Sequence, residues 1–205
     1  QPDLTPGEKY LRTLEHLGSS SLISDVSQYT LNNLQKSYAQ LDQGTVEQIV
    51  DILLSSDRKY IAGFRGTACC AQYMASKLLF LTPHVVPILH ADATAVENLL
   101  DITERDCLFL YSFPRYSEIA RPLMEIARES GAKVILMTDR RTSPLANKAD
   151  VVVTAQVDGL GFTNSYVAPL SLSEVILLSV SGRRDVTDSK RFNRIDSVMD
   201  REKLY

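Results

Sequence analysis

Short apolar runs alternate with helical patterns through the middle of this 205-residue chain, and this alternation limits the fold more than any other feature. Each run has the length of a buried strand, and the segments between the runs show apolar residues at helical spacing. Strands that alternate with helices of about 10 to 15 residues form a parallel sheet covered on both faces. We therefore expect an α/β fold, a doubly wound five-stranded parallel sheet flanked by helices. The predicted strands are Tyr60–Ala62, Val85–Leu89, Cys107–Tyr111, Val134–Met137 and Val151–Val153.

The first 55 residues contain no strand-like run and are predicted to be helical. Thr5 and Pro6 are typical of a helix start, an N-cap residue followed by proline in the first turn. A long apolar helix is predicted over Thr163–Val180, and the charged residues after it show weak helical periodicity. The chain is therefore expected to divide into a helical arm (1–55), an α/β domain (56–182) and a helical tail (183–205).

Composition and charge narrow the class of protein. An apolar share of 44% and a charged share of 23% are ordinary for a soluble globular protein. No run approaches the ~20 apolar residues of a membrane span, and the first ten residues do not resemble a signal peptide. A net charge of −3 gives no global attraction to nucleic acid, so this chain is not expected to bind DNA by itself. Because the first residue is Gln rather than Met, we expect further chain upstream.

The cysteines predict neither a disulfide framework nor a metal site. Cys69, Cys70 and Cys107 lie in apolar surroundings, and no metal-ligand spacing relates them to the three histidines. We therefore expect buried thiols in a reducing cytoplasm, with no metal and no cofactor.

Ligands of open α/β sheets bind at the carboxyl ends of the strands, and the turn 112–117 has the strongest chemistry there. Ser112, Arg115 and Ser117 lie between the third strand and a helix predicted over Glu118–Ser130. Backbone N–H groups and the helix dipole favour an anion at such a place, and hydroxyl and guanidinium groups bind phosphate. Ser117 could instead cap the helix, and Arg115 could be a solvated surface residue.

Two further turns fall at the same end of the predicted sheet. In the turn 63–68, Gly63 and Gly66 allow a ligand to approach the backbone closely, and Thr67 lies at a helix start. The glycines could instead serve tight packing of the strand against the helix. The Gly-x-x-Gly spacing is not a dinucleotide fingerprint and no Walker lysine is present, which disfavours a nucleotide-binding protein. In the turn 138–144, Ser143 and Pro144 are predicted to open a helix.

Together these turns resemble the sugar isomerase (SIS) domain, a phosphosugar-binding α/β module. The resemblance covers about Lys59–Gly182 and is strongest over 131–139, 143–146 and 149–152. With the helical lead-in, the chain is most similar to the C-terminal ligand domain of RpiR-type transcriptional regulators. In that family an N-terminal helix-turn-helix domain binds DNA and the SIS domain senses a sugar phosphate. The resemblance implies that the helix-turn-helix lies upstream of Gln1, and that 1–55 form connector and dimerisation helices.

The resemblance also assigns roles in the site. It places the phosphate-binding hydroxyls at Ser112 and Ser117, opposite Gly66 and Thr67. The family commonly has Ser-Gly in the middle of the second turn, where this chain has Pro114-Arg115; proline removes an amide donor and arginine adds a cation. The sugar hydroxyls are expected to reach toward two further residues, so that the predicted ligand-binding set is Gly66, Thr67, Ser112, Arg115, Ser117, Arg65 and His90.

SIS enzymes interconvert aldose and ketose phosphates, which requires a base that moves a proton between adjacent carbons. Four residues are candidates for this base. His16 lies in the helical arm and His84 starts a strand. His90 is better suited to a hydrogen bond with the ligand, and Glu97 to a solvated helix face. No convincing acid/base pair follows, so no catalytic residue is predicted. We expect a cytoplasmic, sugar-phosphate-sensing effector domain of a bacterial regulator, a homodimer or tetramer that meets DNA only through its upstream domain and does not bind membranes. The alternative is a free-standing aldose/ketose phosphate isomerase.

Overall fold

A computed structural model describes residues 5–17, 21–161, 163–183 and 189–203. The opening segment is helical, as predicted, and consists of three helices: α1 (Pro6–Leu17), α2 (Leu22–Gln40) and α3 (Gln43–Ser55). The predicted cap of α1 is reciprocal, since the Glu8 N–H donates to Thr5 Oγ1 (3.3 Å) while the Thr5 N–H donates to the Glu8 carboxylate (2.7 Å). None of the described helices is long and apolar enough to cross a membrane.

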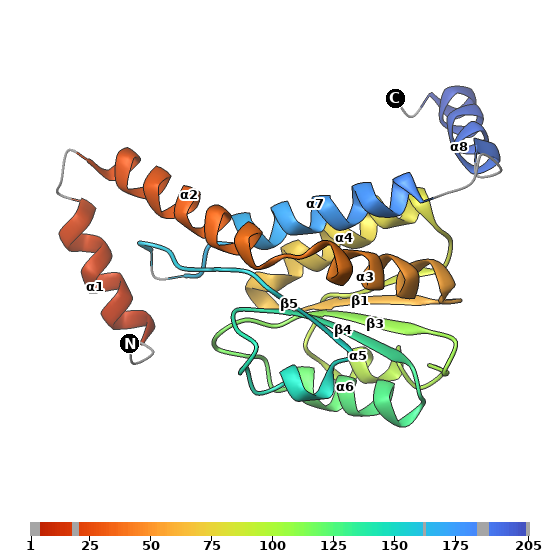
Figure 1. The fold of residues 1–205 in the computed structure, drawn as a ribbon, viewed down its shortest axis with the longest axis horizontal. Helices are drawn as coiled ribbons and strands as arrows, with labels where there is room; N and C mark the ends of the chain where they lie inside the picture. The colour runs from red at the N-terminus through yellow and green to blue at the C-terminus, as the bar shows by residue number, and fades with distance from the viewer. Residues whose placement is uncertain (1–4, 18–20, 162, 184–188, 204–205) are drawn as a thin grey trace.

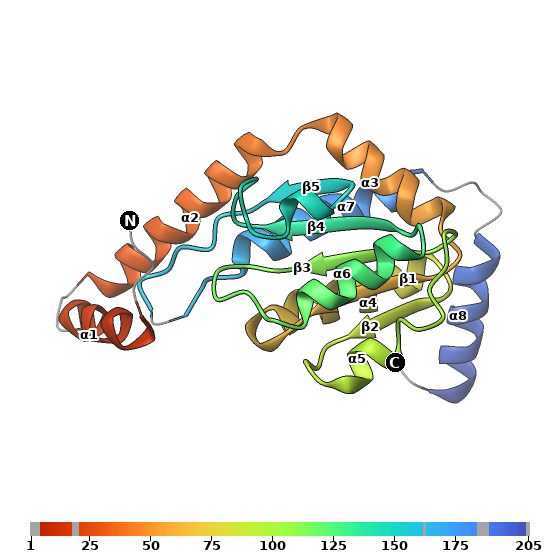
Figure 2. The same ribbon diagram turned by 90° about the horizontal axis from the view of Figure 1, so that it is seen from below.

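The five predicted strands are present, each within a residue or two of its expected bounds, and all their pairings are parallel. The order across the sheet is β2-β1-β3-β4-β5, which confirms the doubly wound α/β fold (Figures 1 and 2). In the pairing of β1 with β3, Gly63 lies opposite Tyr111, so the turns that follow these two strands start at the same level. The strands are β1 (Lys59–Gly63), β2 (Val85–Ile88), β3 (Cys107–Tyr111), β4 (Lys133–Thr138) and β5 (Val151–Thr154).

Helices cover both faces of the sheet (Figure 1). On one face lie α3, α4 (Ala68–Leu81) and α7 (Val167–Gly182), and on the other α5 (Ala93–Glu97) and α6 (Ala120–Glu129). Alternate strand residues enter two separate apolar clusters; Phe109, for example, packs toward α4 and α7, whereas Leu108 packs toward α6. Because both faces are buried, the strands are continuous apolar runs instead of alternating ones.

The N-terminal helices are attached to the segment between β5 and α7 by polar contacts. Asn33 and Ser37 are buried on α2; the Asn33 amide donates to the Asp158 carbonyl (2.5 Å), and the Ser37 hydroxyl accepts from the Gln156 N–H (2.8 Å). On α1, the Thr13 hydroxyl donates to the Leu160 carbonyl (2.7 Å). Residues 155–166 are called the β5–α7 loop below, and this loop is the part of the α/β layer that α1 and α2 contact through these bonds (Figure 1).

Two predicted helix starts are wrong. The helix predicted from Thr163 begins only at Val167, because the Ser165 N–H donates back to the Val157 carbonyl (3.0 Å) and closes the β5–α7 loop. Ser143 and Pro144 precede only a single 3-10 turn, η2 (Ala146–Lys148). The chain must return to the sheet at once there, since the Asp150 N–H donates to the Val134 carbonyl and the Asp150 carboxylate accepts from the Val134 N–H.

The cysteine prediction is confirmed in part. Cys70 and Cys107 are buried, whereas Cys69 is exposed in the first turn of α4, and its thiol donates to the Gly66 carbonyl (3.1 Å). Burial raises the pKa of the Cys107 thiol to about 11 and raises that of Cys70 further. All three cysteines are free thiols, and in the described part of the chain no group of three His, Cys, Asp or Glu side chains could hold a metal ion.

Candidate functional site

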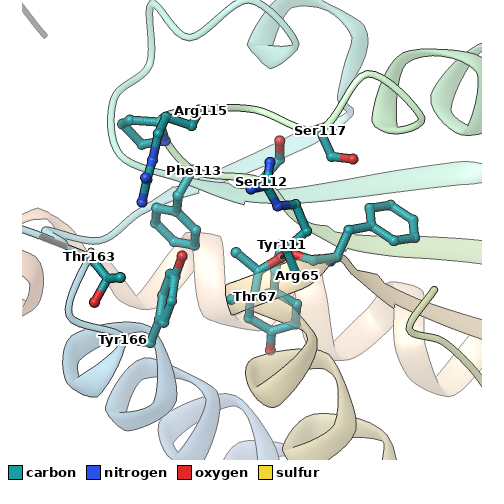
Figure 3. Close-up of a pocket in the computed structure, with 12 residues that line it drawn as sticks. Arg65, Thr67, Tyr111, Ser112, Phe113, Arg115, Ser117, Thr163 and Tyr166 are labelled. Carbon is teal, nitrogen blue, oxygen red and sulfur yellow. Dashed lines mark hydrogen bonds between the residues drawn. The ribbon is translucent and has the colours of Figure 1, made fainter. Parts of the chain in front are cut away.

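The site lies at the point where the strand order reverses. From β1 the chain crosses to β2 on one side, and β3 lies on the other side of β1. The turns after β1 and β3 therefore lead away from each other and leave a crevice at the carboxyl ends of the strands, where open α/β sheets bind ligands. A cavity of about 310 Å³ fills this crevice (Figure 3). Its lining residues are Phe64, Arg65, Gly66, Thr67, Tyr111, Ser112, Phe113, Pro114, Arg115, Ser117, Thr163 and Tyr166.

The turn after β1 is held by Thr67. Its hydroxyl accepts from the Phe64 N–H (2.8 Å) and donates to the Phe64 carbonyl (2.9 Å), and its own N–H donates to the same carbonyl (3.1 Å). Both donors of Thr67 are thus engaged within the turn. Thr67 lines the cavity and shapes it, and a hydrogen bond from its hydroxyl to phosphate would require that hydroxyl to rotate.

The turn after β3 presents a buried hydroxyl without a partner. Ser112 is 4% exposed, and its N–H donates to the Met137 carbonyl of β4 (3.0 Å), which fixes the start of the turn. Its Oγ atom has no hydrogen-bond partner among the described residues, although it is fully buried in the cavity wall. A buried polar group left unsatisfied costs about 1 to 3 kcal/mol. The Ser112 hydroxyl would have to rotate toward the cavity for a ligand there to become its partner.

Ser117 stands at the other end of this turn. Its carbonyl accepts the Ala120 N–H (3.1 Å) at the start of α6, two residues later than the predicted start of that helix, and no side-chain cap is formed there. The backbone N–H groups of Arg115, Tyr116 and Ser117 donate to no acceptor within the described ranges. The half-buried Ser117 hydroxyl and these amides are therefore free to bind an anion.

Two arginines of the cavity have backbone conformations that are uncommon for residues other than glycine. Arg65 has φ 56° and Arg115 has φ 67°, both in the left-handed region. Such a conformation costs about 1 to 2 kcal/mol, and strain of this kind concentrates at functional sites. No ion pair joins either guanidinium to an acid in the described part of the chain, and the lining residues include no Asp or Glu. The cavity is therefore cationic and suits an anionic ligand.

The β5–α7 loop supplies the remaining wall, with Thr163 and Tyr166. The Tyr166 ring meets Phe113 edge to face, with 6.0 Å between centroids, and the nearby Asn164 amide donates to the Pro114 carbonyl (3.3 Å). Sequence reasoning missed this wall because it assigned Thr163 and Tyr166 to an apolar helix. The sequence did contain a signal for a loop here. Gly159, Gly161 and the run Thr163-Asn164-Ser165 are typical of a loop.

The tyrosines in and beside the cavity are hydrogen-bond donors. The Tyr111 hydroxyl lies 2.7 Å from Ser173 Oγ, which donates to the Pro169 carbonyl, so Tyr111 is the donor of the pair. Tyr116 donates to the Asp139 carboxylate (2.6 Å). Burial raises the pKa of both phenols, with Asp139 adding to the effect at Tyr116, so both stay protonated at neutral pH.

The histidines lie elsewhere. His90 follows β2 at the edge of the sheet, is exposed, and is not among the residues that line the cavity. His84 and Glu97 are also exposed, and the side chain of His16 lies outside the described residues. The structure thus brings Arg65, Gly66, Thr67, Ser112, Arg115 and Ser117 together around one cavity and leaves His90 outside it.

A doubly wound α/β sheet with a cationic crevice at its reversal point defines a class of small-molecule binding domains. The chain belongs to the SIS domain family, whose model matches residues 52–179, more than half of its length. Among curated proteins none matches this sequence.

Solved structures share the fold at low sequence identity. The sugar isomerase domain of an RpiR transcription factor from Sphaerobacter thermophilus has a TM-score of 0.83 and 21% identity, over 87% of this chain and 99% of that one. The Vibrio vulnificus NanR protein complexed with ManNAc-6P has a TM-score of 0.74 and 15% identity, over 91% and 71%. The Methanococcus jannaschii protein MJ1247, for which a function as 3-hexulose-6-phosphate isomerase was inferred, has a TM-score of 0.64 and 16% identity, over 83% and 97%. The fold therefore occurs in both regulators and proteins described as isomerases.

Proposed function

We propose that this chain is the sugar-phosphate-binding effector domain of a bacterial transcriptional regulator, and that it holds its ligand without converting it. The phosphate lies against the hydroxyls of Ser112 and Ser117 and the free amides of 115–117, with Arg65 and the Gly66 turn opposite. The unpartnered, buried hydroxyl of Ser112 is the observation that carries this assignment. The similarity to an RpiR domain and to NanR supports the regulatory role. Such a domain acts in the cytoplasm as a dimer or tetramer, and DNA is bound by a helix-turn-helix domain upstream of residue 1.

The composition of the cavity wall supports binding over turnover. Isomerisation through an enediol requires a general base near the sugar carbons. The described lining residues include no Asp, Glu or His, and burial raises the pKa of both Tyr111 and Tyr166. A wall of arginines, hydroxyls and protonated phenols binds an anion but offers no group that would remove a proton from carbon.

Substitution of Ser112 tests the phosphate site. Ser112→Ala should lower the affinity for a bound sugar phosphate by about 1 to 3 kcal/mol, roughly 5- to 150-fold, because a hydrogen bond to a charged group is lost. Titration calorimetry with ManNAc-6P and a panel of hexose and pentose phosphates measures the change. Ser143→Ala is the matched control, since Ser143 Oγ is also buried and unpartnered but does not line the cavity. Equal affinity in parent and Ser112→Ala protein would contradict the assignment.

The similarity to MJ1247 supports a second candidate function for this chain, that of an aldose/ketose phosphate isomerase. Incubation of the protein with aldose phosphates, followed by NMR of the anomeric and ketose signals, separates the two. We expect binding without conversion; steady formation of ketose phosphate that is abolished in Ser112→Ala would establish the enzyme instead.

A further inference from the structure

The turn after β3 keeps its shape without backbone hydrogen bonds of its own. Among the described residues, no such bond joins two members of the turn 112–117. Arg115, in the middle of the turn, has φ 67°, in the left-handed region that favours glycine. A strained conformation of this kind persists only where the surrounding structure holds it in place. The bonds that fix this turn therefore come from other parts of the chain.

The end of β4 holds the turn at two places. At the start of the turn, the Ser112 N–H donates to the carbonyl of Met137, in β4 (3.0 Å). Near its end, the Tyr116 hydroxyl donates to the carboxylate of Asp139, the residue that directly follows β4 (2.6 Å). Hydrogen bonds to an ionised acceptor are shorter and stronger than bonds between neutral groups. The bond between Tyr116 and Asp139 is of this stronger kind.

Asp139 is itself fixed in position. The Thr138 hydroxyl donates to the carboxylate oxygen that accepts from the phenol (3.2 Å), and the Arg140 guanidinium lies 3.6 Å from the other oxygen. Thr138 is fully buried, and the Asp139 side chain is 14% exposed. The β5–α7 loop adds only a longer, neutral bond, from the Asn164 amide to the Pro114 carbonyl (3.3 Å). Asp139 is therefore well suited to anchor the turn.

The Tyr116 side chain is not part of the cavity wall. Tyr116 is half-buried and is not among the lining residues, although its neighbours Arg115 and Ser117 are (Figure 3). Burial and the nearby Asp139 raise the pKa of Tyr116, so the phenol keeps the proton that it donates. Any effect of this side chain on a bound phosphate is therefore indirect, through the position of the turn.

We propose that Tyr116 and Asp139 are positioning residues, whose hydrogen bond holds the N–H groups of 115–117 and the Ser117 hydroxyl in place for the phosphate. The inference rests on the proposed function and adds the residues that keep its phosphate turn ordered. A site that is ordered before binding loses less conformational freedom when the ligand arrives, and so binds it more tightly. Without the bond, the strained backbone at Arg115 relaxes and each ligand has to order the turn again.

Tyr116→Phe tests the inference because it removes one hydroxyl group and keeps the ring. We expect sugar phosphates to bind about five- to twentyfold more weakly, which is part of the effect of a hydrogen bond to a charged group. Since the bond acts on the phosphate turn alone, the loss should be similar for ManNAc-6P, ribose 5-phosphate and inorganic phosphate. Titration calorimetry measures the sugar phosphates, and competition against them measures inorganic phosphate.

Variants at Asp139 show whether the bond itself is responsible. Asp139→Asn keeps an oxygen that accepts from Tyr116 and should retain most of the affinity, whereas Asp139→Ala should lose as much as Tyr116→Phe. The double variant Tyr116→Phe/Asp139→Ala should lose no more than either single variant, because both remove the same bond. Tyr38→Phe is the control; its hydroxyl lies 2.8 Å from Ser171 Oγ, away from the cavity, and its loss should leave the affinity unchanged.

A role in stability alone predicts a different result. Urea denaturation establishes that each variant is folded at the temperature of the titration, and if Tyr116→Phe is not, the comparison of Asp139→Ala with Asp139→Asn replaces it. A lower free energy of unfolding with unchanged affinity of the folded protein would overturn the inference. A loss that affects one sugar phosphate and spares inorganic phosphate would also overturn it, because Tyr116 would then act on the sugar.

The outcomes also separate this inference from the proposed function. If Ser112→Ala weakens binding and neither Tyr116→Phe nor Asp139→Ala does, the phosphate site stands and the positioning role is wrong. If the parent protein binds no phosphorylated compound, the proposed function and the inference fail together.

Discussion

The ring of Tyr166 lies against Gly66 so closely that a Cβ atom on Gly66 would stand 2.8 Å from the Tyr166 hydroxyl oxygen. This contact joins two walls of the cavity that are about one hundred residues apart in the sequence, the turn after β1 and the β5–α7 loop. Glycine at position 66 is thus explained by the approach of an aromatic ring.

Gly66→Ala should therefore narrow the cavity. The added methyl group displaces the half-buried Tyr166 ring toward the ligand space, and we expect at least a tenfold loss of sugar-phosphate affinity in titration calorimetry. The free energy of unfolding should fall by only about 1 kcal/mol, the low end for an overpacked site, because the ring can move. Gly182→Ala is the control, since nothing lies within 4 Å of a Cβ there. Retained affinity in Gly66→Ala would show that Tyr166 does not bound the ligand.

Alkaline pH should destabilise the protein through Cys107. Burial raises the pKa of this thiol to about 11 from its ordinary value of 9.0. Between these values the unfolded chain has lost the proton that the folded chain retains, so stability falls as pH rises, by at most about 1.4 kcal/mol per pH unit. Urea unfolding at pH 8, 9 and 10 under reducing conditions should show a shallower decline for Cys107→Val than for the parent. Parallel declines would mean that the thiol ionises equally in both states.

The three thiols should differ in reactivity. Cys69 is exposed in the first turn of α4, whereas burial of Cys70 and Cys107 raises the pKa of each thiol and shields it. A thiol reagent such as dithiobis(nitrobenzoate) should modify one cysteine rapidly in the folded protein and all three only in denaturant. Cys69→Ser should abolish the rapid phase. Two rapid equivalents would place Cys70 closer to solvent than the fold indicates.

The contact between α2 and the β5–α7 loop should contribute measurably to stability. Ser37→Ala leaves the Gln156 N–H without its acceptor, which costs about 1 to 3 kcal/mol for a buried group. Urea denaturation measures the loss, and Ser27→Ala, at an exposed position of the same helix, should change stability by less than about 0.5 kcal/mol. Similar values for the two variants would indicate that α2 is only loosely attached to the loop.

The sheet could be predicted from the sequence because burial on both faces makes each strand a continuous apolar run. Cys107–Tyr111 illustrates this, since all five residues are buried and the predicted bounds are the observed ones. Helix starts were harder to predict, because they depend on hydrogen bonds to residues outside the helical segment itself. The bond between Ser165 and Val157 delays α7, and the bonds between Asp150 and Val134 end the segment after Pro144.

Much of the cavity wall could be predicted from the sequence. The turns that follow parallel strands lie at one edge of the sheet, and two of these turns contain serines and arginines, which suit an anion. The position of Tyr166 in the cavity wall could not be predicted, since it depends on how the β5–α7 loop folds back. Cys69 shows a similar limit: its apolar neighbours suggested burial, but which side of the first turn of α4 faces solvent is set by the packing of the whole helix. That these residues bind a sugar phosphate remains a prediction.

The β5–α7 loop has a consequence for how such a protein can change over time. Its distal part, Thr163 and Tyr166, borders the ligand space, while its proximal part accepts hydrogen bonds from Thr13 and Asn33 of the leading helices. A substitution in this loop that reshapes the cavity is therefore expected to move the backbone to which α1 and α2 are hydrogen-bonded. If the cavity holds the proposed ligand, sequence changes that alter its specificity will also alter how these helices are attached.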